Sequence, residues 1–408
     1  MLAIVVGGGP APGINGVISS ATIEAINEGM DVVGILGGFK TLFEGKESDI
    51  IPLTIDEVTR IPTRGGSILR TSRDYPDNVQ EKFRTMMATI GRLGIDYLLT
   101  IGGEGTLFMS NWICREAQGN LRVVHVPKTI DNDIPLPGGL SSFGYETARH
   151  EGVRIVTNLM EDALSTGRWY FITTMGRHAG HLALGIGRAA GATITLIPEE
   201  FEGESIPIDQ VSDVLTGAII KRLSMGKDHG VAILAEGMSE RIAFDTEDYD
   251  GATVKDEMGR VRLSEIPLGE ALKRISRRTL DACGLKVTIV DKNIGYELRA
   301  ADPIPFDRDY TRNLGYGAVR FLKGGGTGST IISDAQDIQS IPFSEFIDQA
   351  GQSRIRKVDV RSQLYEVARK YMIRLEPDDL EGKQLRKLAS LTCLEPEEFQ
   401  KRFAPSTM

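Results

Sequence analysis

Cysteine and histidine are scarce in this chain, whose 408 residues include 3 cysteines and 5 histidines. The cysteines, Cys114, Cys283 and Cys393, show no CxxC spacing, which excludes a disulfide framework and a cysteine zinc site. The histidines form no HExxH motif, so the common helical zinc site of metalloproteases is also absent. Scattered thiols of this kind are typical of proteins in a reducing compartment.

Long apolar runs are also missing. The longest are well short of the roughly 18 residues that a membrane-spanning helix needs. The first residues form an apolar run followed at once by three glycines, without the basic region that opens a secretory signal. We therefore expect a cytoplasmic protein without a membrane partner.

Positive charge is in the minority, with 47 Lys and Arg against 56 Asp and Glu and a net charge of −9. Because nucleic acids attract basic surfaces, this balance predicts that no nucleic acid is bound. A phosphorylated ligand would have to find a local cluster of cations.

Apolar runs that end at glycine or proline dominate the remaining pattern. Hydrophobic residues make up 41% and charged residues 25%, as is usual for globular chains, and the length predicts two or three domains. Alternating strand-like and helical segments predict mostly parallel sheets, in which ligands bind beyond the carboxyl ends of the strands. The strand-like runs are residues 2–6, 31–36, 95–101, 122–126, 170–174, 194–197 and 230–234.

Three loops at these strand ends carry polar chemistry. Gly7-Gly8-Gly9 leaves room for a ligand, although a plain strand-to-helix turn would look the same, and it matches neither GxGxxG nor the Walker motif. In residues 102–106 a carboxylate between glycines could hold a divalent metal or be an exposed acid. In residues 127–133 two carboxylates lie beside a lysine, which pairs a candidate general base with a phosphate-neutralising cation.

Taken together, these motifs resemble those of the phosphofructokinase family. They occur in the family's order over about residues 1–325, and Lys-Thr-Ile-Asp-Asn-Asp at 128–133 and Met-Gly-Arg at 175–177 are highly specific. The other matching stretches are residues 8–15, 66–73, 102–106, 143–148, 235–237 and 295–299.

The resemblance implies an α/β fold of two doubly wound, mostly parallel-sheet domains, with an active-site cleft between them and a helical C-terminal extension. We expect a phosphoryl-donor-binding domain at 1–138, completed by 263–300, and a sugar-phosphate-binding domain at 139–262, completed by 301–335. The helical extension is expected at 336–408. The polar stretch 238–262 also predicts a surface loop.

The resemblance further implies a 6-phosphofructokinase that phosphorylates the 1-hydroxyl of fructose 6-phosphate with Mg²⁺. Asp131 matches the general base, Asp133 its partner acid, and Glu104 a metal carboxylate that is often Asp in the family. The catalytic set it implies is Lys128, Thr129, Asp131, Asp133 and Arg177. The donor-binding set is Gly9, Arg73, Gly103, Glu104, Gly105 and Thr106.

The sugar phosphate needs fixed cations in an acidic protein. The substrate-binding residues that the resemblance implies are Thr129, Asp131, Arg168, Met175, Gly176, Arg177, Glu236, Lys292, Tyr296 and Arg299. In the family the counterpart of Arg168 reaches a neighbouring subunit, so we expect a homo-oligomer, dimer or tetramer, with a shared active site. Tyr296 stands where many members have histidine.

Two residues give opposed indications of the phosphoryl donor. Pyrophosphate users in the family usually have Asp at the position of Gly105, so glycine there favours ATP. Lys128 matches a lysine of pyrophosphate users. We expect ATP, with pyrophosphate as the alternative. The glycine has more weight, because a side chain in the α-phosphate position would exclude ATP outright, whereas an added lysine need only change the affinity. A catalytically silent regulatory subunit is a more remote alternative, which the retained acids Glu104, Asp131 and Asp133 disfavour.

Overall fold

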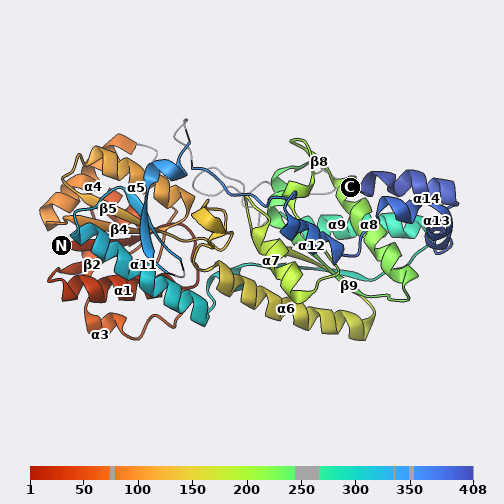
Figure 1. Cartoon of the computed structure of the whole chain (residues 1–408), viewed down its shortest axis with the longest axis horizontal. Coiled ribbons are helices and arrows are strands. Elements are labelled where there is room, and N and C mark those ends of the chain that lie inside the picture. Colours follow the sequence, from red (N-terminus) through yellow and green to blue (C-terminus); the bar gives the residue numbers. More distant parts are fainter. Residues whose placement is uncertain (74–78, 244–265, 335, 349–352, 408) are drawn as a thin grey trace. The chain divides into compact units, whose positions relative to one another are not determined.

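The computed structural model describes residues 1–73, 79–243, 266–334, 336–348 and 353–407, which form two compact units (Figure 1). Among these residues, the first unit comprises Met1–Ala148 and Tyr296–Arg356. The second comprises residues 149–243, 266–295 and 357–407. Each unit has its own sheet, and the α/β fold with mostly parallel sheets is confirmed.

The sheet of the first unit has seven strands in the order β13-β12-β5-β4-β1-β2-β3. The five central strands are parallel, and β13 and β3 pair antiparallel at the two edges. The strands are β1 (Leu2–Val6), β2 (Val32–Ile35), β3 (Ile50–Pro52), β4 (Tyr97–Gly102), β5 (Arg122–Pro127), β12 (Ser329–Ser333) and β13 (Ile338–Pro342).

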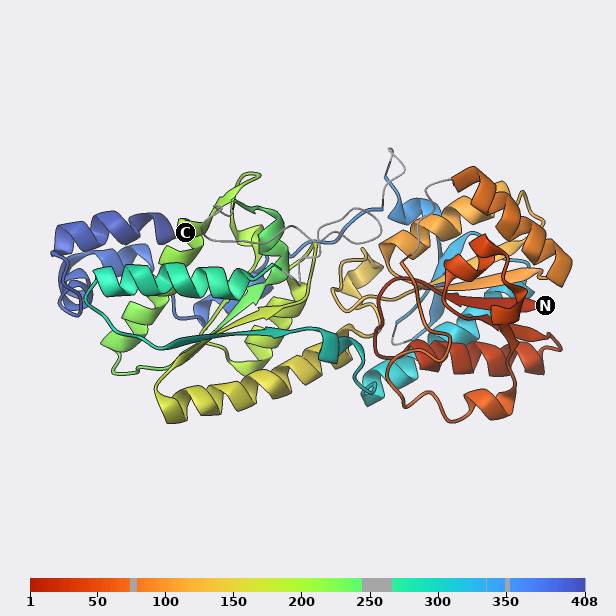
Figure 2. The same cartoon turned by 180° about the vertical axis from the view of Figure 1, so that it is seen from behind.

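Helices cover both faces of this sheet, which is why its central strands are continuous apolar runs. On β1, Leu2 and Ile4 face a core shared with α1 and α11, while Ala3 and Val5 face a core shared with α2, α4 and α5. Figure 2 shows the helices on the two faces of this sheet from behind. The helices are α1 (Ile14–Asn27), α2 (Phe39–Glu44), α3 (Ile55–Val58), α4 (Val79–Leu93), α5 (Glu104–Glu116), α10 (Tyr296–Arg299) and α11 (Pro305–Lys323).

Glycines allow α1 and α11 to pack backbone against backbone. A Cβ atom on Gly16 would lie 2.3 Å from Thr311 Oγ1, and one on Gly315 would lie 2.7 Å from the carbonyl oxygen of Val17. Any larger residue at either position would push the helices apart. Helix α11 therefore belongs to the first unit, although it lies far from α1 in the sequence.

The second unit contains a four-stranded, fully parallel sheet in the order β11-β6-β9-β7 and a short parallel pair, β10-β8. Its strands are β6 (Trp169–Thr174), β7 (Ile194–Leu196), β8 (Ile206–Pro207), β9 (Gly230–Ala235), β10 (Ile242–Ala243) and β11 (Ile289–Ile294). Its helices are α7 (His181–Ala190), α8 (Ile208–Ser224), α9 (Leu268–Ala282), α12 (Gln363–Lys370), α13 (Gly382–Ala389) and α14 (Pro396–Phe403), together with most of α6 (Tyr145–Thr166).

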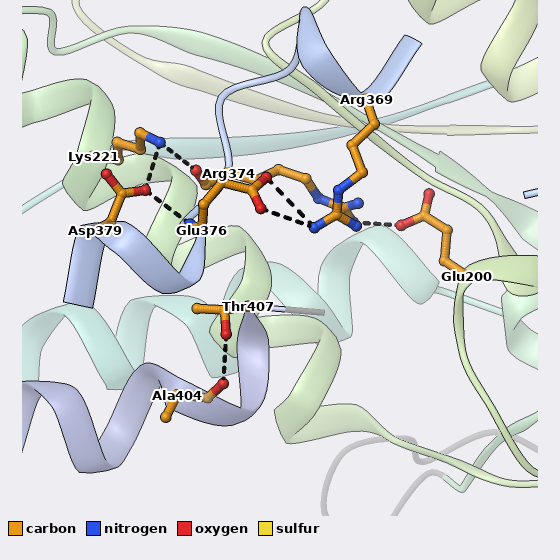
Figure 3. Close-up of polar contacts among 8 residues, drawn as sticks. All are labelled: Glu200, Lys221, Arg369, Arg374, Glu376, Asp379, Ala404 and Thr407. Carbon is orange, nitrogen blue, oxygen red and sulfur yellow. Dashed lines mark hydrogen bonds and ion pairs between the residues drawn. The ribbon is translucent and has the colours of Figure 1, made fainter. Parts of the chain in front are cut away.

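The C-terminal helices are part of the second unit's core. Leu388, Phe399 and Phe403 are fully buried in the apolar cluster that also contains α8 and α9. Polar anchors hold the same segment (Figure 3). Arg374 pairs with Glu200, and each side chain is only 5% exposed.

Lys221 adds a second anchor in the same region (Figure 3). Its Nζ donates to Asp379 Oδ2 at 2.6 Å and to the carbonyl oxygen of Arg374 at 2.7 Å. The C-terminal helices predicted for this region are therefore confirmed as helices, but they are packed elements of a domain.

The structure corrects the predicted division of the chain after residue 262. Strand β11 pairs with β6 and so completes the second unit, whereas β12 pairs with β5 and completes the first. The predicted roles of 263–300 and 301–335 are thus largely exchanged, because the apolar pattern of a strand does not specify the strand beside it. Residues 338–342, predicted as helical extension, form edge strand β13. The predicted loop 238–262 lies outside the described residues from position 244 onward.

None of the helices in the described part of the chain is long and apolar enough to cross a membrane.

Candidate active site

The carboxyl ends of β1, β4 and β5 bring the three predicted loops of the first unit together. From β1 the chain continues to β2 on one side, and from β4 it continues to β5 on the other, so β1 and β4 flank a topological switch point. Gly7-Gly8-Gly9 follows β1, α5 begins at Glu104 directly after β4, and Lys128 follows β5. This is the position at which open α/β sheets bind ligands.

Gly7 and Gly102 let α5 begin close to these strand ends, because they leave room for the side chain of Thr106. A Cβ atom on Gly102 would lie 2.1 Å from Thr106 Oγ1, and one on Gly7 would lie 2.3 Å from the same oxygen. The hydroxyl of Thr106 therefore packs against the backbone of both loops. Gly103 forms the N-cap of the helix, so the predicted donor residues 103–106 lie on its first turn.

Three cations gather around Gly9. A Cβ atom on this glycine would lie 3.0 Å from Arg299 Nη1 and 3.1 Å from Arg73 Nη2. Lys128, only 4% exposed, donates a hydrogen bond from Nζ to the carbonyl oxygen of Gly9. Because like charges repel, a compact anion is the ligand that such a cluster favours.

The surroundings of Lys128 act on its pKa in opposite directions. Burial and, to a smaller extent, the nearby positive charges of Arg73 and Arg299 lower its pKa to about 7, while Asp131 and Asp133 oppose the shift. A bound phosphate group would favour the ammonium form.

Carboxylates line the same loops. Burial, together with the negative charges of Asp131 and Glu104, raises the pKa of Asp133 to about 7, while a hydrogen bond from Thr129 opposes the shift. The Asp131 N–H donates to Thr129 Oγ1 at 3.1 Å. The part of the chain that the structure describes contains no group of three or more His, Cys, Asp or Glu side chains arranged to hold a metal ion.

Arg356 is a residue of this region that sequence reasoning missed. Its Nη1 donates to the carbonyl oxygen of Leu140 at 2.9 Å, and its Nε donates to that of Asn132 at 3.1 Å. It lies in a mixed-charge stretch more than 200 residues after the loop that it contacts, so no motif indicated it.

A second set of predicted residues comes together at the carboxyl ends of β6 and β9 in the second unit. The Gly176 N–H donates to Glu236 Oε1 at 3.3 Å, and the Gly237 N–H donates to the carbonyl oxygen of Gly176 at 3.1 Å. A Cβ atom on Gly295 would lie 2.5 Å from Met175 Cγ, so the end of β11 also contacts this loop.

Two predicted cations belong to this part of the second unit: Arg177 lies just beyond the end of β6, and Lys292 lies on β11. Arg177, 18% exposed, pairs with Glu240 through Nη1 and Oε1 at 3.1 Å. Lys292 is exposed on β11, two residues before the strand ends. Together with Glu236, these groups could bind the phosphate and hydroxyls of a sugar phosphate.

Besides Thr129 and Asp131 of the first unit, three further predicted substrate residues are separate from this second set. Arg168 directly precedes β6 and therefore lies at the opposite end of the strand from Met175, roughly 20 Å away at about 3.3 Å per residue. Tyr296 and Arg299 belong to the first unit, where the guanidinium carbon of Arg299 lies 4.7 Å from the centre of the Tyr296 ring. The structure thus places Arg299 with Arg73 and Lys128.

Known proteins resemble most or all of this chain. The phosphofructokinase family model matches residues 1–322. The pyrophosphate–fructose 6-phosphate 1-phosphotransferase of Thermotoga maritima is 53% identical, with 100% of this chain and 98% of the relative covered. The enzyme of the same name from Naegleria fowleri is 45% identical, with 98% and 94% covered. The ATP-dependent 6-phosphofructokinase of Mycobacterium bovis is 32% identical, with 85% and 94% covered.

Solved structures support the fold. Phosphofructokinase from Pichia pastoris in the T-state matches with a TM-score of 0.67 and 22% identity, and the match covers 99% of this chain and 38% of that one. The chain thus spans well under half of that protein. Pyrophosphate-dependent phosphofructokinase from Marinobacter aquaeolei matches with a TM-score of 0.66 and 16% identity over 92% of each chain.

The family model spans most of the sequence, and a relative that is 53% identical covers all of it. The loops that carry the family motifs lie at the strand ends where the fold binds ligands. The chain belongs to the phosphofructokinase family.

Proposed function

We propose that this protein transfers a phosphoryl group from pyrophosphate to the 1-hydroxyl of fructose 6-phosphate. The observation that carries the proposal is the cluster of Arg73, Lys128 and Arg299 around Gly9, beside the carboxylates that follow β5. Pyrophosphate is compact and highly charged, so three cations around one glycine suit it. Relatives with 53% and 45% identity carry the name of this activity, which favours pyrophosphate over the ATP expected from Gly105.

In the proposed reaction, Asp131 takes the proton from the 1-hydroxyl as that oxygen attacks the terminal phosphorus. The bond from this phosphorus to the bridging oxygen breaks, and inorganic phosphate leaves. Phosphoryl transfer depends chiefly on positioning and charge neutralisation, so a carboxylate is a sufficient base. Lys128, Arg73 and Arg299 would neutralise the donor. Met175, Gly176, Arg177, Glu236 and Lys292 would hold the sugar phosphate.

The carboxylates of the first unit fit a magnesium ion. Mg²⁺ in phosphoryl-transfer sites is held by one or two carboxylates plus the substrate's phosphates, and it keeps several waters. Glu104 and Asp133 repel each other enough to contribute to the raised pKa of Asp133. We propose that these two side chains would hold the ion, which supplies charge neutralisation to the phosphates when bound.

ATP remains the second candidate donor because Gly105 offers no side chain that could occupy the α-phosphate position. Met109 weighs against it. Members of the family often have a glycine at this position, where it lies under the adenine of ATP. Here the position is occupied by a methionine that is 3% exposed within the core.

The donor can be decided by measuring fructose 1,6-bisphosphate formation with Mg²⁺ and either donor. We expect kcat/KM for pyrophosphate to exceed that for ATP at least tenfold, which is about 1.4 kcal/mol of transition-state discrimination. A higher value with ATP would reverse the assignment. As a control, Gly105→Asp should remove any residual use of ATP and retain activity with pyrophosphate.

We further propose that Arg168 serves the sugar-phosphate site of a neighbouring subunit, because it lies at the far end of β6 from Met175. Chains carrying Arg168→Ala and chains carrying Asp131→Asn should each be nearly inactive. After subunit exchange, the mixture should regain part of the parental activity, since some sites would then contain neither substitution. No gain after verified exchange would place every site within one chain.

A further inference from the structure

We infer that Arg356 is a positioning residue that sets the conformation of the loop carrying Asp131 and Asp133. The inference rests on the proposed function for its catalytic consequence, but the contacts that carry it do not. Arg356 lies outside residues 1–322, the part that the family model matches. The segment containing it, residues 353–356, is named the strap below.

The Arg356 guanidinium spans the loop. Nε and Nη2 donate to the backbone and side-chain oxygens of Asn132, and Nη1 donates to the carbonyl oxygen of Leu140 at 2.9 Å. The backbone N–H of Arg356 donates to the carbonyl oxygen of Asp133 at 2.7 Å. One residue therefore fixes both the segment between the two carboxylates and the far end of the loop.

Asn132 needs such support because its backbone is in the left-handed region, with φ at 56°. Residues other than glycine adopt this conformation at an energetic cost, and they keep it only where surrounding contacts over-determine it. The Ser142 N–H donates to Asn132 Oδ1 at 3.2 Å, and Arg356 contacts the same oxygen. Asn132 lies directly between Asp131 and Asp133, so its conformation decides where both carboxylates leave the backbone.

The strap also contacts the backbone at Glu104, the residue that begins α5. The Ser353 hydroxyl donates to the carbonyl oxygen of Glu104 at 3.3 Å, and the Arg354 N–H donates to that of Phe346 at 2.8 Å. The contacts of the strap with Asn132, Asp133 and Glu104 thus run through main-chain oxygens or an amide. Such contacts fix the course of the backbone from which the acid side chains extend.

Three nitrogens of the Arg356 side chain donate hydrogen bonds at once, which requires a guanidinium group. Its planar fork presents several N–H groups in fixed directions, whereas a lysine ammonium is a single flexible centre. The side chain is half-buried, which lowers the pKa of Arg356, and the negative charge of Asp133 opposes that shift.

The test compares Arg356→Ala, Arg356→Lys and the control Arg354→Ala, whose side chain is exposed two residues away. We expect Arg356→Ala to lower kcat roughly 10- to 100-fold, as misplacement of a catalytic group does. The KM for fructose 6-phosphate should change less than about threefold, because sugar-phosphate binding is proposed for the second unit. Added guanidinium ion should restore part of the turnover in Arg356→Ala. Arg356→Lys should lie between this variant and the parent, and Arg354→Ala should match the parent.

A second readout needs no substrate. Amide hydrogen exchange over residues 129–142 should become faster in Arg356→Ala and remain unchanged in Arg354→Ala, because the loop loses its anchor. Should Arg356→Ala fail to fold, Arg356→Lys carries both measurements. Parental kcat, or unchanged exchange in the loop, overturns the inference. If the parent protein phosphorylates fructose 6-phosphate with neither donor, the proposed function fails, and exchange alone then decides the role of Arg356.

Discussion

Replacing Asp131 with asparagine should lower kcat by roughly 10²- to 10⁴-fold, the usual effect of losing general acid–base catalysis. Asparagine keeps the size of the side chain and cannot accept the hydroxyl proton. Binding of fructose 6-phosphate should be retained, because the proposed sugar-phosphate residues lie on other strands. Steady-state kinetics with the preferred donor and equilibrium binding of the sugar phosphate measure the two effects separately.

The matched control is Asp56→Asn, which changes an exposed carboxylate on α3 and should leave kcat unchanged. Turnover of Asp131→Asn within a few-fold of the parent would remove Asp131 from the role of base. A large loss of sugar-phosphate affinity with little change in kcat would instead assign it to binding.

Replacing Arg374 with methionine should destabilise the second unit by about 3–5 kcal/mol, the range found when one partner of a buried ion pair is removed. Arg374 and Glu200 are both 5% exposed, so the variant leaves a buried carboxylate without its cation. The loss should be seen as a lower midpoint in denaturant unfolding followed by a probe in the second unit, such as Trp169.

Arg369→Met provides the control visible in Figure 3. Arg369 pairs with Glu376 at 3.5 Å, and these side chains are 24% and 45% exposed, so its loss should cost at most about 1 kcal/mol. The double variant Arg374→Met, Glu200→Gln should recover part of the stability, since no unpaired charge stays buried. Equal effects of the two arginine variants would contradict the assignment of Arg374–Glu200 as the principal polar anchor.

The parts of the site that the sequence predicted are those encoded locally. The apolar run at residues 2–6 and the three glycines after it determine a strand and its ligand-facing turn without help from distant residues. The same holds for the loops after β4 and β5. Because parallel strands share one edge for their carboxyl ends, their meeting could also be inferred.

The parts that the sequence did not predict depend on distant pairing. The placement of β11 and β12 required knowing which strand edge was free, and neither strand is marked by its own sequence as the neighbour of β6 or of β5. The grouping of Arg299 with Arg73 and Lys128 follows from that placement, because Arg299 lies just beyond β11 at the start of the segment that returns to the first unit. Arg356 was missed for the same reason.

The order in which the strands occur along the chain has a consequence for biosynthesis. Strand β5 ends at Pro127, and its neighbour β12 begins at Ser329. About 200 residues lie between these two positions. At a synthesis rate of about 5–20 residues per second, their translation takes roughly 10–40 seconds. During that time one edge of β5 has no strand beside it, and an open apolar edge invites pairing with other chains. Slow translation should therefore aggravate aggregation of this protein, and early capture of the nascent first unit by chaperones should relieve it.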